Sequence, residues 1–410
     1  MSTGYPGGLV TKSPTATVGA VDSGFGLEGG TASGIWTVDQ AAALKQQGLW
    51  PAKSKSKILY AMGTSGGVVG DNVSIQRSSP VQIGSDTSWS KITVGGNFSA
   101  AIKTDGTLWL WGHGGVGQLG QNNGVLKSSP TQVGALTTWS DVSGGGTAVM
   151  AVKTDGSLWA WGSNVYGQLG LNDVVYRSSP VQIGSLYTWS KIGAGVQTQA
   201  AIKTDGTLWL WGNGSYGQLG NNTAIRRSSP VQVGALTTWS LISGAKYHNI
   251  ALQSNGSLWS FGYNGRGQLG MAGDSKSSPT QIGALTTWSK IGAGGMTCGA
   301  IKTDGTLWSW GRNTEVGGLG TNTQGSSTDA GSPVQVGSDT NWSSIDHGDP
   351  TAGAVLAIKT NGTLWGWGAN GEGELGINVN SARSSPVQIG TGTNWAKAVT
   401  SSGSLIIEAS

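Results

Sequence analysis

The chain has 410 residues, of which 72 are glycine, 20 are tryptophan and only 11% are charged. Much glycine argues against a helical protein, and many bulky rings argue against disorder, so the composition favours an all-β fold. Its single cysteine, Cys298, excludes an intramolecular disulfide and a thiolate-rich metal site. A net charge of +4 is too dilute for nucleic-acid binding by charge alone, and no apolar run has the length of a membrane span.

Residues 1–56 lie outside any repeat and are expected to form a Gly/Ser/Thr-rich N-terminal arm. Residues 37–40, Thr-Val-Asp-Gln, have the spacing of a capping box, residues 41–47 favour helix, and Gly48 with Pro51 favours an end, so one short helix is predicted. Four apolar residues flank this helix and would be costly to expose: Ile35, Trp36, Leu49 and Trp50. We expect them to anchor the arm on another chain.

The arm resembles the N-terminal segment of some virion proteins of tailed phages, on the strength of residues 32–51, ASGIWTVDQAAALKQQGLWP, and the Gly-rich run before them. This resemblance implies attachment to other virion proteins, self-association in the particle, and synthesis in the host cytoplasm. The absence of a signal sequence at the start agrees with it.

Residues 57–410 contain three landmarks that recur about every 50 residues. The first is Trp-Ser or a near equivalent, at Trp89, Trp139, Trp189, Trp239, Trp288, Trp342 and Trp395. The second is LWxWG, with six copies and a disguised seventh at residues 59–63, LYAMG. The third is a Ser-Pro pair that ends at Pro80, Pro130, Pro180, Pro230, Pro279, Pro333 and Pro386. These landmarks indicate seven structural units.

Each unit contains short alternating segments separated by turn residues, which is typical of β-strands. Asp-Gly between apolar runs, as at residues 105–106, predicts a hairpin, and the whole unit predicts four strands. Seven units of this kind fit a seven-bladed β-propeller. The last unit lacks a strand that is present at Ile58–Met62, so we expect an N-terminal strand to close the ring.

The repeats resemble those of the regulator of chromosome condensation family, in which an LWxWG strand is followed by Gly-Gln-Leu-Gly. That motif occurs at residues 117–120, 167–170, 217–220 and 267–270, and varies at 317–320 and 373–376. The resemblance implies a seven-bladed propeller. It leaves function open, because family members include a nucleotide exchange factor for a small GTPase, a β-lactamase inhibitor and a plant photoreceptor.

Catalytic, metal and cofactor sites are not expected. His113, His248 and His347 fall in different repeats and registers and are interpreted as surface-loop residues, whereas Cys298 is interpreted as a small buried hydrophobe. The repeated tryptophans are interpreted as blade-packing residues, with sugar stacking as the alternative. The chain is therefore predicted not to be an enzyme.

Sequence variation between units concentrates in loops that a four-stranded blade sends to one side, which we call the variable face. The variable segments are residues 97–98, 122–127, 172–177, 196–199, 222–227, 246–249, 272–276, 321–330 and 347–351. Such positions often bind a partner in repeat proteins, although neutral drift of solvent loops would look the same. The candidate partner-binding residues are Phe98, Tyr176, Tyr216, Arg226, Tyr247, Tyr263 and Arg266.

A basic residue precedes Ser-Ser-Pro in six of the seven units, at Arg77, Lys127, Arg177, Arg227, Lys276 and Arg383. This basic ring would attract an anionic glycan or an acidic protein surface, or it would only stabilise loops.

Together these features predict a non-enzymatic phage virion component, as a capsid decoration, tail or fibre protein. Its arm would fix it to the particle, and its propeller would present a binding face to a host-surface glycan or protein. The alternative is a free propeller module that binds or inhibits a protein partner.

Overall fold

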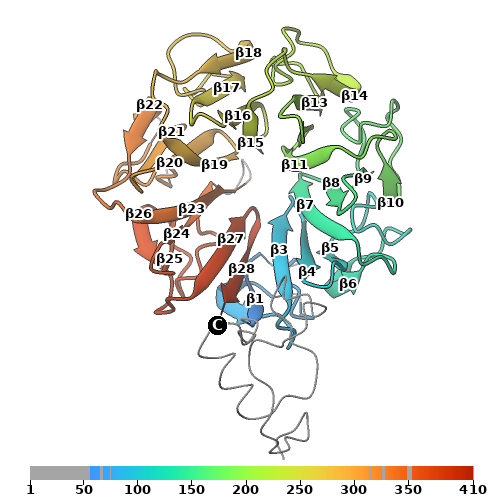
Figure 1. Cartoon of the computed structure of the whole chain (residues 1–410). Coiled ribbons are helices and arrows are strands. Elements are labelled where there is room, and N and C mark those ends of the chain that lie inside the picture. The colour runs from blue at the N-terminus through green and yellow to red at the C-terminus, as the bar shows by residue number, and fades with distance from the viewer. Residues whose placement is uncertain are drawn as a thin grey trace, which may run out of the picture. The chain divides into compact units, whose positions relative to one another are not determined.

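The structure is a computed structural model that describes residues 56–64, 68–73, 75–313, 316–325, 328–348 and 353–409. These residues form seven four-stranded antiparallel sheets arranged in a ring (Figure 1). The predicted all-β, seven-bladed propeller is therefore confirmed. The N-terminal arm, with its predicted helix and the anchors Ile35, Trp36, Leu49 and Trp50, lies outside the described residues.

Blades one to six are each continuous in sequence, with the first strand at the centre of the ring and the fourth at the periphery (Figure 1). Blade one contains β3 (Trp89–Val94), β4 (Phe98–Lys103), β5 (Leu108–Gly112) and β6 (Lys127–Gln132); blade two contains β7 (Trp139–Gly145), β8 (Ala148–Lys153), β9 (Leu158–Gly162) and β10 (Arg177–Gln182); blade three contains β11 (Trp189–Ala194), β12 (Thr198–Lys203), β13 (Leu208–Gly212) and β14 (Arg227–Gln232).

Blade four contains β15 (Trp239–Gly244), β16 (His248–Gln253), β17 (Leu258–Gly262) and β18 (Lys276–Gln281); blade five contains β19 (Trp288–Gly294), β20 (Thr297–Lys302), β21 (Leu307–Gly311) and β22 (Ala330–Gln335); blade six contains β23 (Trp342–His347), β24 (Ala354–Lys359), β25 (Leu364–Gly368) and β26 (Arg383–Gln388). Each peripheral strand carries the proline of the Ser-Pro landmark. Proline is tolerated there because an edge strand has a side with no ladder hydrogen bonds to lose.

Blade seven is built from both ends of the ring. Its order is β2–β1–β28–β27, with β27 (Trp395–Thr400) and β28 (Gly403–Ala409) from the end of the chain and β1 (Lys57–Gly63) and β2 (Arg77–Gln82) from the front. The pairing of β1 with β28 runs from Lys57 opposite Ala409 to Gly63 opposite Gly403. The predicted closure is confirmed, and the front of the chain supplies two strands of this blade.

The Trp-Ser landmark marks a β-bulge at the start of each central strand. In blade three the pairing shifts between Trp189 and Lys191, and the Ser190 hydroxyl donates a 3.0 Å hydrogen bond to the Ile202 carbonyl on β12. The tryptophan before the serine is buried in the blade. A small hydroxyl residue is thus used at the bulge because it bonds the neighbouring strand locally.

The second tryptophan of LWxWG joins neighbouring blades. Trp161 is fully buried, and its indole N–H donates a 2.9 Å hydrogen bond to the carbonyl of Gln118, in the Gly-Gln-Leu-Gly turn of the preceding blade. Trp211 repeats this bond to Gln168 at 2.9 Å. The LWxWG strand of one blade therefore contacts the Gly-Gln-Leu-Gly turn of the preceding blade, and this contact between blades repeats along the chain.

The first tryptophan of LWxWG packs under the Lys-Thr-Asp-Gly hairpin. In blade three, the Lys203 ammonium lies 3.9 Å from the Trp209 ring centroid, and the Trp209 N–H donates to the Thr207 hydroxyl at 2.9 Å. Thr207 in turn donates to Asp205 at 2.7 Å. The hydrogen bonds from the Thr207 hydroxyl and backbone N–H lower the pKa of Asp205. Gly206 completes the turn at φ +78°, a left-handed conformation that favours glycine.

Candidate binding face

Two kinds of loop emerge together on the variable face: the hairpin between the first and second strands of each blade, and the long loop between its third and fourth strands. The Asp-Gly hairpins and the connections between blades emerge on the opposite side, which we call the constant face. Lys57 and Ala409 pair at the constant-face end of blade seven, and the Lys57 N–H donates to the Thr87 carbonyl in a blade connection. Both ends of the ring therefore lie on the constant face.

A cavity of about 190 Å³ opens at the centre of the variable face. The ends of the first strands line it, and it is rich in glycine and hydroxyl residues. Lys246, Asp346 and His347 are the ionisable groups in the lining. Burial raises the pKa of Asp346 to about 7 despite a hydrogen bond from Thr400. Asp346 is the acidic exception at a position where most blades have Thr, Ser or Gly.

The hairpins around this cavity need glycine because consecutive hairpins touch through their backbones. A Cβ atom on Gly195 would lie 2.3 Å from the carbonyl oxygen of Ala245 in the next blade, and one on Gly145 would lie 2.1 Å from the carbonyl oxygen of Gly195. Distances this short are not tolerated. The Gly-rich runs therefore allow the hairpins of consecutive blades to pack closely around the centre of the ring.

Three predicted partner-binding tyrosines meet in one cluster on the variable face. The Tyr216 ring lies 5.1 Å from both Tyr247 and Tyr263, and these two lie 6.3 Å apart, all in edge-to-face geometry. Tyr216 comes from the long loop of blade three, whereas Tyr247 and Tyr263 come from blade four. Tyr216 is 43% exposed. We call these three residues the tyrosine cluster.

The other predicted partner-binding residues lie apart from this cluster or below it. Tyr176 is exposed in blade two, Arg226 donates a 3.3 Å hydrogen bond to the Val165 carbonyl, and Arg266 forms a 3.5 Å ion pair with Asp329. Phe98 does not belong to the surface. It is fully buried, because it fills the space left by Gly95 and Gly144, and its assignment as a contact residue was wrong.

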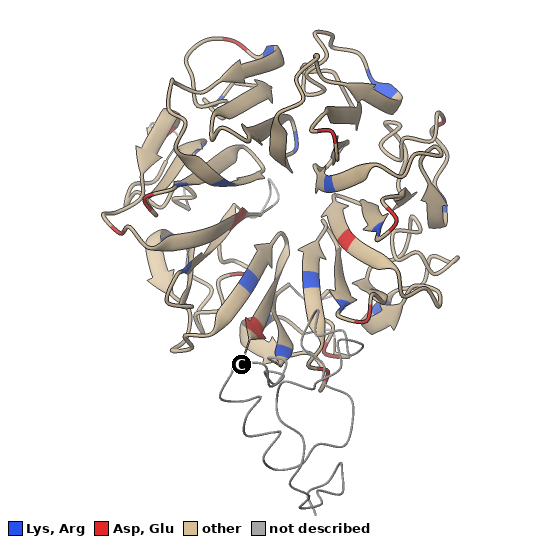
Figure 2. Cartoon of the chain, viewed as in Figure 1, with Lys and Arg blue, Asp and Glu red and all other residues tan. Residues whose placement is uncertain are grey.

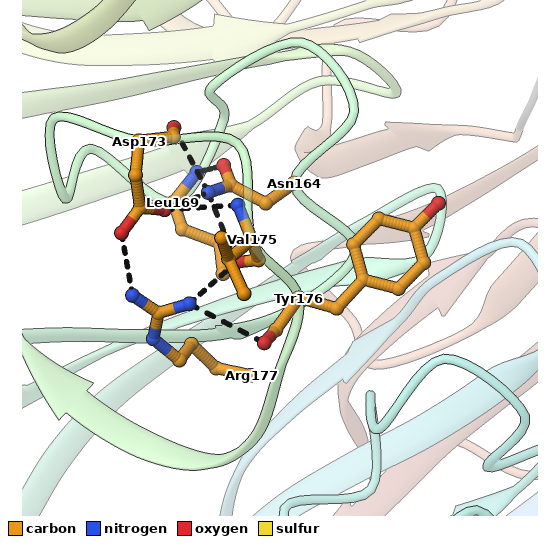
Figure 3. A network of polar contacts seen from close by, with 6 residues as sticks. All are labelled: Asn164, Leu169, Asp173, Val175, Tyr176 and Arg177. Carbon is orange, nitrogen blue, oxygen red and sulfur yellow. Dashed lines mark hydrogen bonds and ion pairs between the residues drawn. The ribbon is translucent and has the colours of Figure 1, made fainter.

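In four blades, the long loop of the variable face is fixed from inside by a buried asparagine. In blade two, the Asn164 amide donates to the Asp173 and Val175 carbonyls at 3.1 Å and accepts from the Leu169 N–H at 2.9 Å (Figure 3). Asn264, Asn313 and Asn370 hold the equivalent loops in blades four, five and six. The loops are thus ordered platforms that leave side chains such as Tyr176 pointing outward (Figure 3).

The basic ring lies where the peripheral strands begin (Figure 2). Two of its members are ion-paired within their own loops at 2.5 Å, Arg77 with Asp71 and Arg177 with Asp173. Loop stabilisation therefore accounts for these two cations. Lys127, Arg227, Lys276 and Arg383 are partly buried at the same register, and within the described residues none has an acidic partner within ion-pair distance.

Comparison with known families decides the classification. The regulator of chromosome condensation (RCC1) repeat matches residues 105–152, 155–202, 205–252, 255–301 and 361–405, and a second model of the same repeat matches residues 139–168. Together these segments cover more than half of the chain. The chain belongs to the RCC1 repeat family.

Solved structures agree with this RCC1 fold. Human WBSCR16 is 18% identical with a TM-score of 0.76, over 87% of this chain and 100% of that one. Yeast RCC1 (Prp20), in a structure bound to Kap60, is 18% identical with a TM-score of 0.75, over 87% and 89% of the two chains. Prp20p of Saccharomyces cerevisiae is 18% identical with a TM-score of 0.74, over 87% of this chain and 92% of that one. At such identity the likeness concerns the fold alone. No curated protein sequence matches the chain significantly.

The interior of this RCC1 propeller holds polar groups that sequence reasoning misplaced. His248 and His347 are buried on β16 and β23, so their interpretation as surface-loop residues was wrong, whereas His113 is exposed. The His248 ring lies 2.9 Å from the Cys298 sulfur, and Thr297 lies 3.2 Å from His347, both across blade boundaries. Burial lowers the pKa of both histidines to about 3 and raises the pKa of Cys298.

These buried groups do not form a metal site within the described part of the chain, where no three His, Cys, Asp or Glu residues are grouped suitably for an ion. Their variation between repeats reflects packing between blades, because each of these side chains contacts a residue of the adjacent blade. Among the residues that the structure describes, no helix is long and apolar enough to cross a membrane.

Proposed function

We propose that this RCC1-type propeller is a non-enzymatic binding module whose variable face contacts a protein partner. The observation that carries the proposal is the set of variable-face loops, where Tyr216, Tyr247 and Tyr263 meet in the tyrosine cluster and Tyr216 is exposed. Exposed apolar side chains line these loops, among them Val125, Val175 and Ile225.

The solved relatives support a protein as the class of partner. Prp20 is described bound to Kap60 and with binding properties towards Gsp1p and histones. An RCC1 propeller can thus bind other proteins, and protein binding in general is the only property that we infer for this chain from the shared fold.

The narrower proposal is a virion component, with residues 1–56 attached to other virion proteins and the variable face directed to the host. It rests on the sequence of the arm and stays a prediction, as do self-association in the particle and a host-surface receptor. Mass spectrometry of purified particles tests it: stoichiometric copies in particles would support the virion role, and recovery only as free protein would favour the free module.

Site-specific photo-crosslinking tests the binding face. The constant face also exposes apolar residues, Leu136, Leu186, Leu236 and Leu285, which were not anticipated from the near-identical blade connections. A photoreactive residue would replace Val125 or Ile225 on the variable face and, as matched controls, Leu136 or Leu236 on the constant face. We expect a discrete crosslinked protein from the positions on the variable face. Crosslinks only from the leucine positions would overturn the proposal.

A further inference from the structure

We propose that the variable face of blades three and four binds an acidic peptide segment of the partner protein. This inference rests on the proposed function and specifies the chemistry that the partner presents. It concerns loops in residues 195–276, where the described chain has no gap.

The tyrosine cluster provides an ordered and accessible platform. Its three rings contact one another across the boundary between blades three and four, so each ring restricts the others before any partner arrives. Tyrosines held in this way contribute contact area at a low cost in conformational entropy. Their hydroxyl groups can donate hydrogen bonds to carboxylates, and their faces can contact aliphatic side chains.

A cation lies at the edge of this platform. The Lys246 ammonium lies 5.0 Å from the Tyr247 ring centroid and lines the central cavity. Arg226 and Arg266 are exposed on the long loops of blades three and four, where Arg226 donates to the Val165 carbonyl of blade two and Arg266 pairs with Asp329 of blade five. The variable-face loops of these two blades carry five cations, Arg226, Arg227, Lys246, Arg266 and Lys276, and one acidic residue, Asp274.

The adjacent blades do not share this excess. The corresponding loops of blade two carry one cation, Arg177, which is ion-paired with Asp173 at 2.5 Å. Those of blade five carry Arg312, Glu315 and Asp329, and Asp329 pairs with Arg266. Positive charge and clustered tyrosines therefore coincide in one sector of the ring. Charge-assisted hydrogen bonds from Lys and Arg to carboxylates are among the stronger polar contacts, so the complementary ligand is a peptide with several acidic residues.

Fluorescence anisotropy with the full-length chain tests this inference. The probes are a labelled Glu-rich peptide, the same peptide with every Glu replaced by Gln, and a labelled heparin oligosaccharide. We expect the Glu-rich peptide to bind at least about tenfold more tightly than its Gln counterpart at low salt, and to weaken as salt increases.

Two substitutions in the sector should remove this preference. Tyr216→Ala removes the exposed member of the cluster, and Lys246→Glu reverses the charge at its edge; each should weaken binding of the Glu-rich peptide about tenfold. The matched controls are Tyr187→Ala, an exposed tyrosine on the constant face, and Lys191→Glu, an exposed lysine on β11. Unchanged melting temperatures would show that all four variants fold.

Each outcome decides between the proposals. Equal binding of the two peptides, or equal losses in the controls, would overturn the acidic-peptide inference. Tighter binding of heparin with the same dependence on Tyr216 and Lys246 would assign the sector to an anionic glycan instead. If crosslinking still maps the protein partner to Val125 or Ile225 while Lys246→Glu has no effect, the proposed function stands and this inference fails.

Discussion

The carboxylate of Asp346 on β23 accepts a 2.8 Å hydrogen bond from the backbone N–H of Thr400 in the next blade. Equivalent bonds elsewhere use neutral hydroxyls: Thr93 accepts from the Gly144 N–H and Ser143 from the Ala194 N–H, both at 3.0 Å. Blades six and seven are thus joined by an acid where blades one, two and four use an alcohol to bond the next blade. The pKa of Asp346 is raised to about 7, and burial lowers the pKa of nearby Lys397.

This relationship predicts that Asp346→Asn stabilises the protein at alkaline pH. Because the folded-state pKa lies above the unfolded value of about 3.9, the free energy of unfolding falls as pH rises from about 4 to about 7. Asn removes that loss, so the variant should gain roughly 1–4 kcal/mol at pH 8 and little at pH 4. Urea unfolding across this pH range measures the difference. A gain of equal size at both pH values would contradict the titration of Asp346.

Thr207→Val should destabilise blade three at neutral pH. The hydroxyl links Trp209 to Asp205, and its loss leaves the indole N–H without its partner, at a cost of about 1 kcal/mol. The lowered pKa of Asp205 gives stability that is present above the unfolded pKa and is lost as pH falls through the folded value. The difference between variant and parent should therefore shrink in acid. Thermal unfolding measures it, with the exposed loop residue Thr237→Val as control; similar effects of both variants would refute the proposed bridge.

Gly195→Ala should loosen the centre of the ring. The added methyl group would lie 2.3 Å from the Ala245 carbonyl oxygen, so the backbone must shift, at about 1–3 kcal/mol. Gly115→Ala is the matched control, because a Cβ there meets nothing within 4 Å. Chemical denaturation should separate the two variants clearly. Equal stability would mean that the hairpins are not in close contact.

Deletion of residues 1–63 should damage the ring far more than deletion of residues 1–55. The longer truncation removes β1, whose Leu59, Ala61 and Met62 are fully buried. We expect the melting temperature to fall by at least about 5 °C relative to the shorter truncation, or the protein to become insoluble. Calorimetry of the two purified proteins is the measurement. Matching melting temperatures would show that blade seven does not depend on its N-terminal strand.

Much of the fold was predictable because the landmarks have direct structural causes. Trp-Ser marks a bulge, Asp-Gly a tight turn, and Ser-Pro a peripheral strand, and their repetition in one register defined the number of blades. The closing strand at Ile58–Met62 was predictable for the same reason, since its absence from the last unit was visible in the alignment of the repeats.

Variation between repeats was harder to interpret, because two physical causes produce it. Tyr216 varies where a loop is exposed, whereas Phe98 and His248 vary because each start of a second strand packs against a different neighbouring blade. Both causes give the same pattern in a single sequence. Asp346 was not predicted as a contact residue, because the sequence around it resembles a loop. Its position four residues after Trp342 is what places it beside Thr400.

The assembly of blade seven from both ends of the chain has a consequence for biosynthesis. Strand β1 leaves the ribosome early, but its partner β28 begins only at Gly403. Translation at about 5–20 residues per second keeps β1 waiting for roughly 20–70 seconds, during which its edge towards β28 is unpaired and Leu59 and Ala61 lack their contacts with Leu405 and Ile407. The nascent chain is thus most vulnerable to misassociation before β28 is made, and chaperones that bind exposed strands would act in that interval.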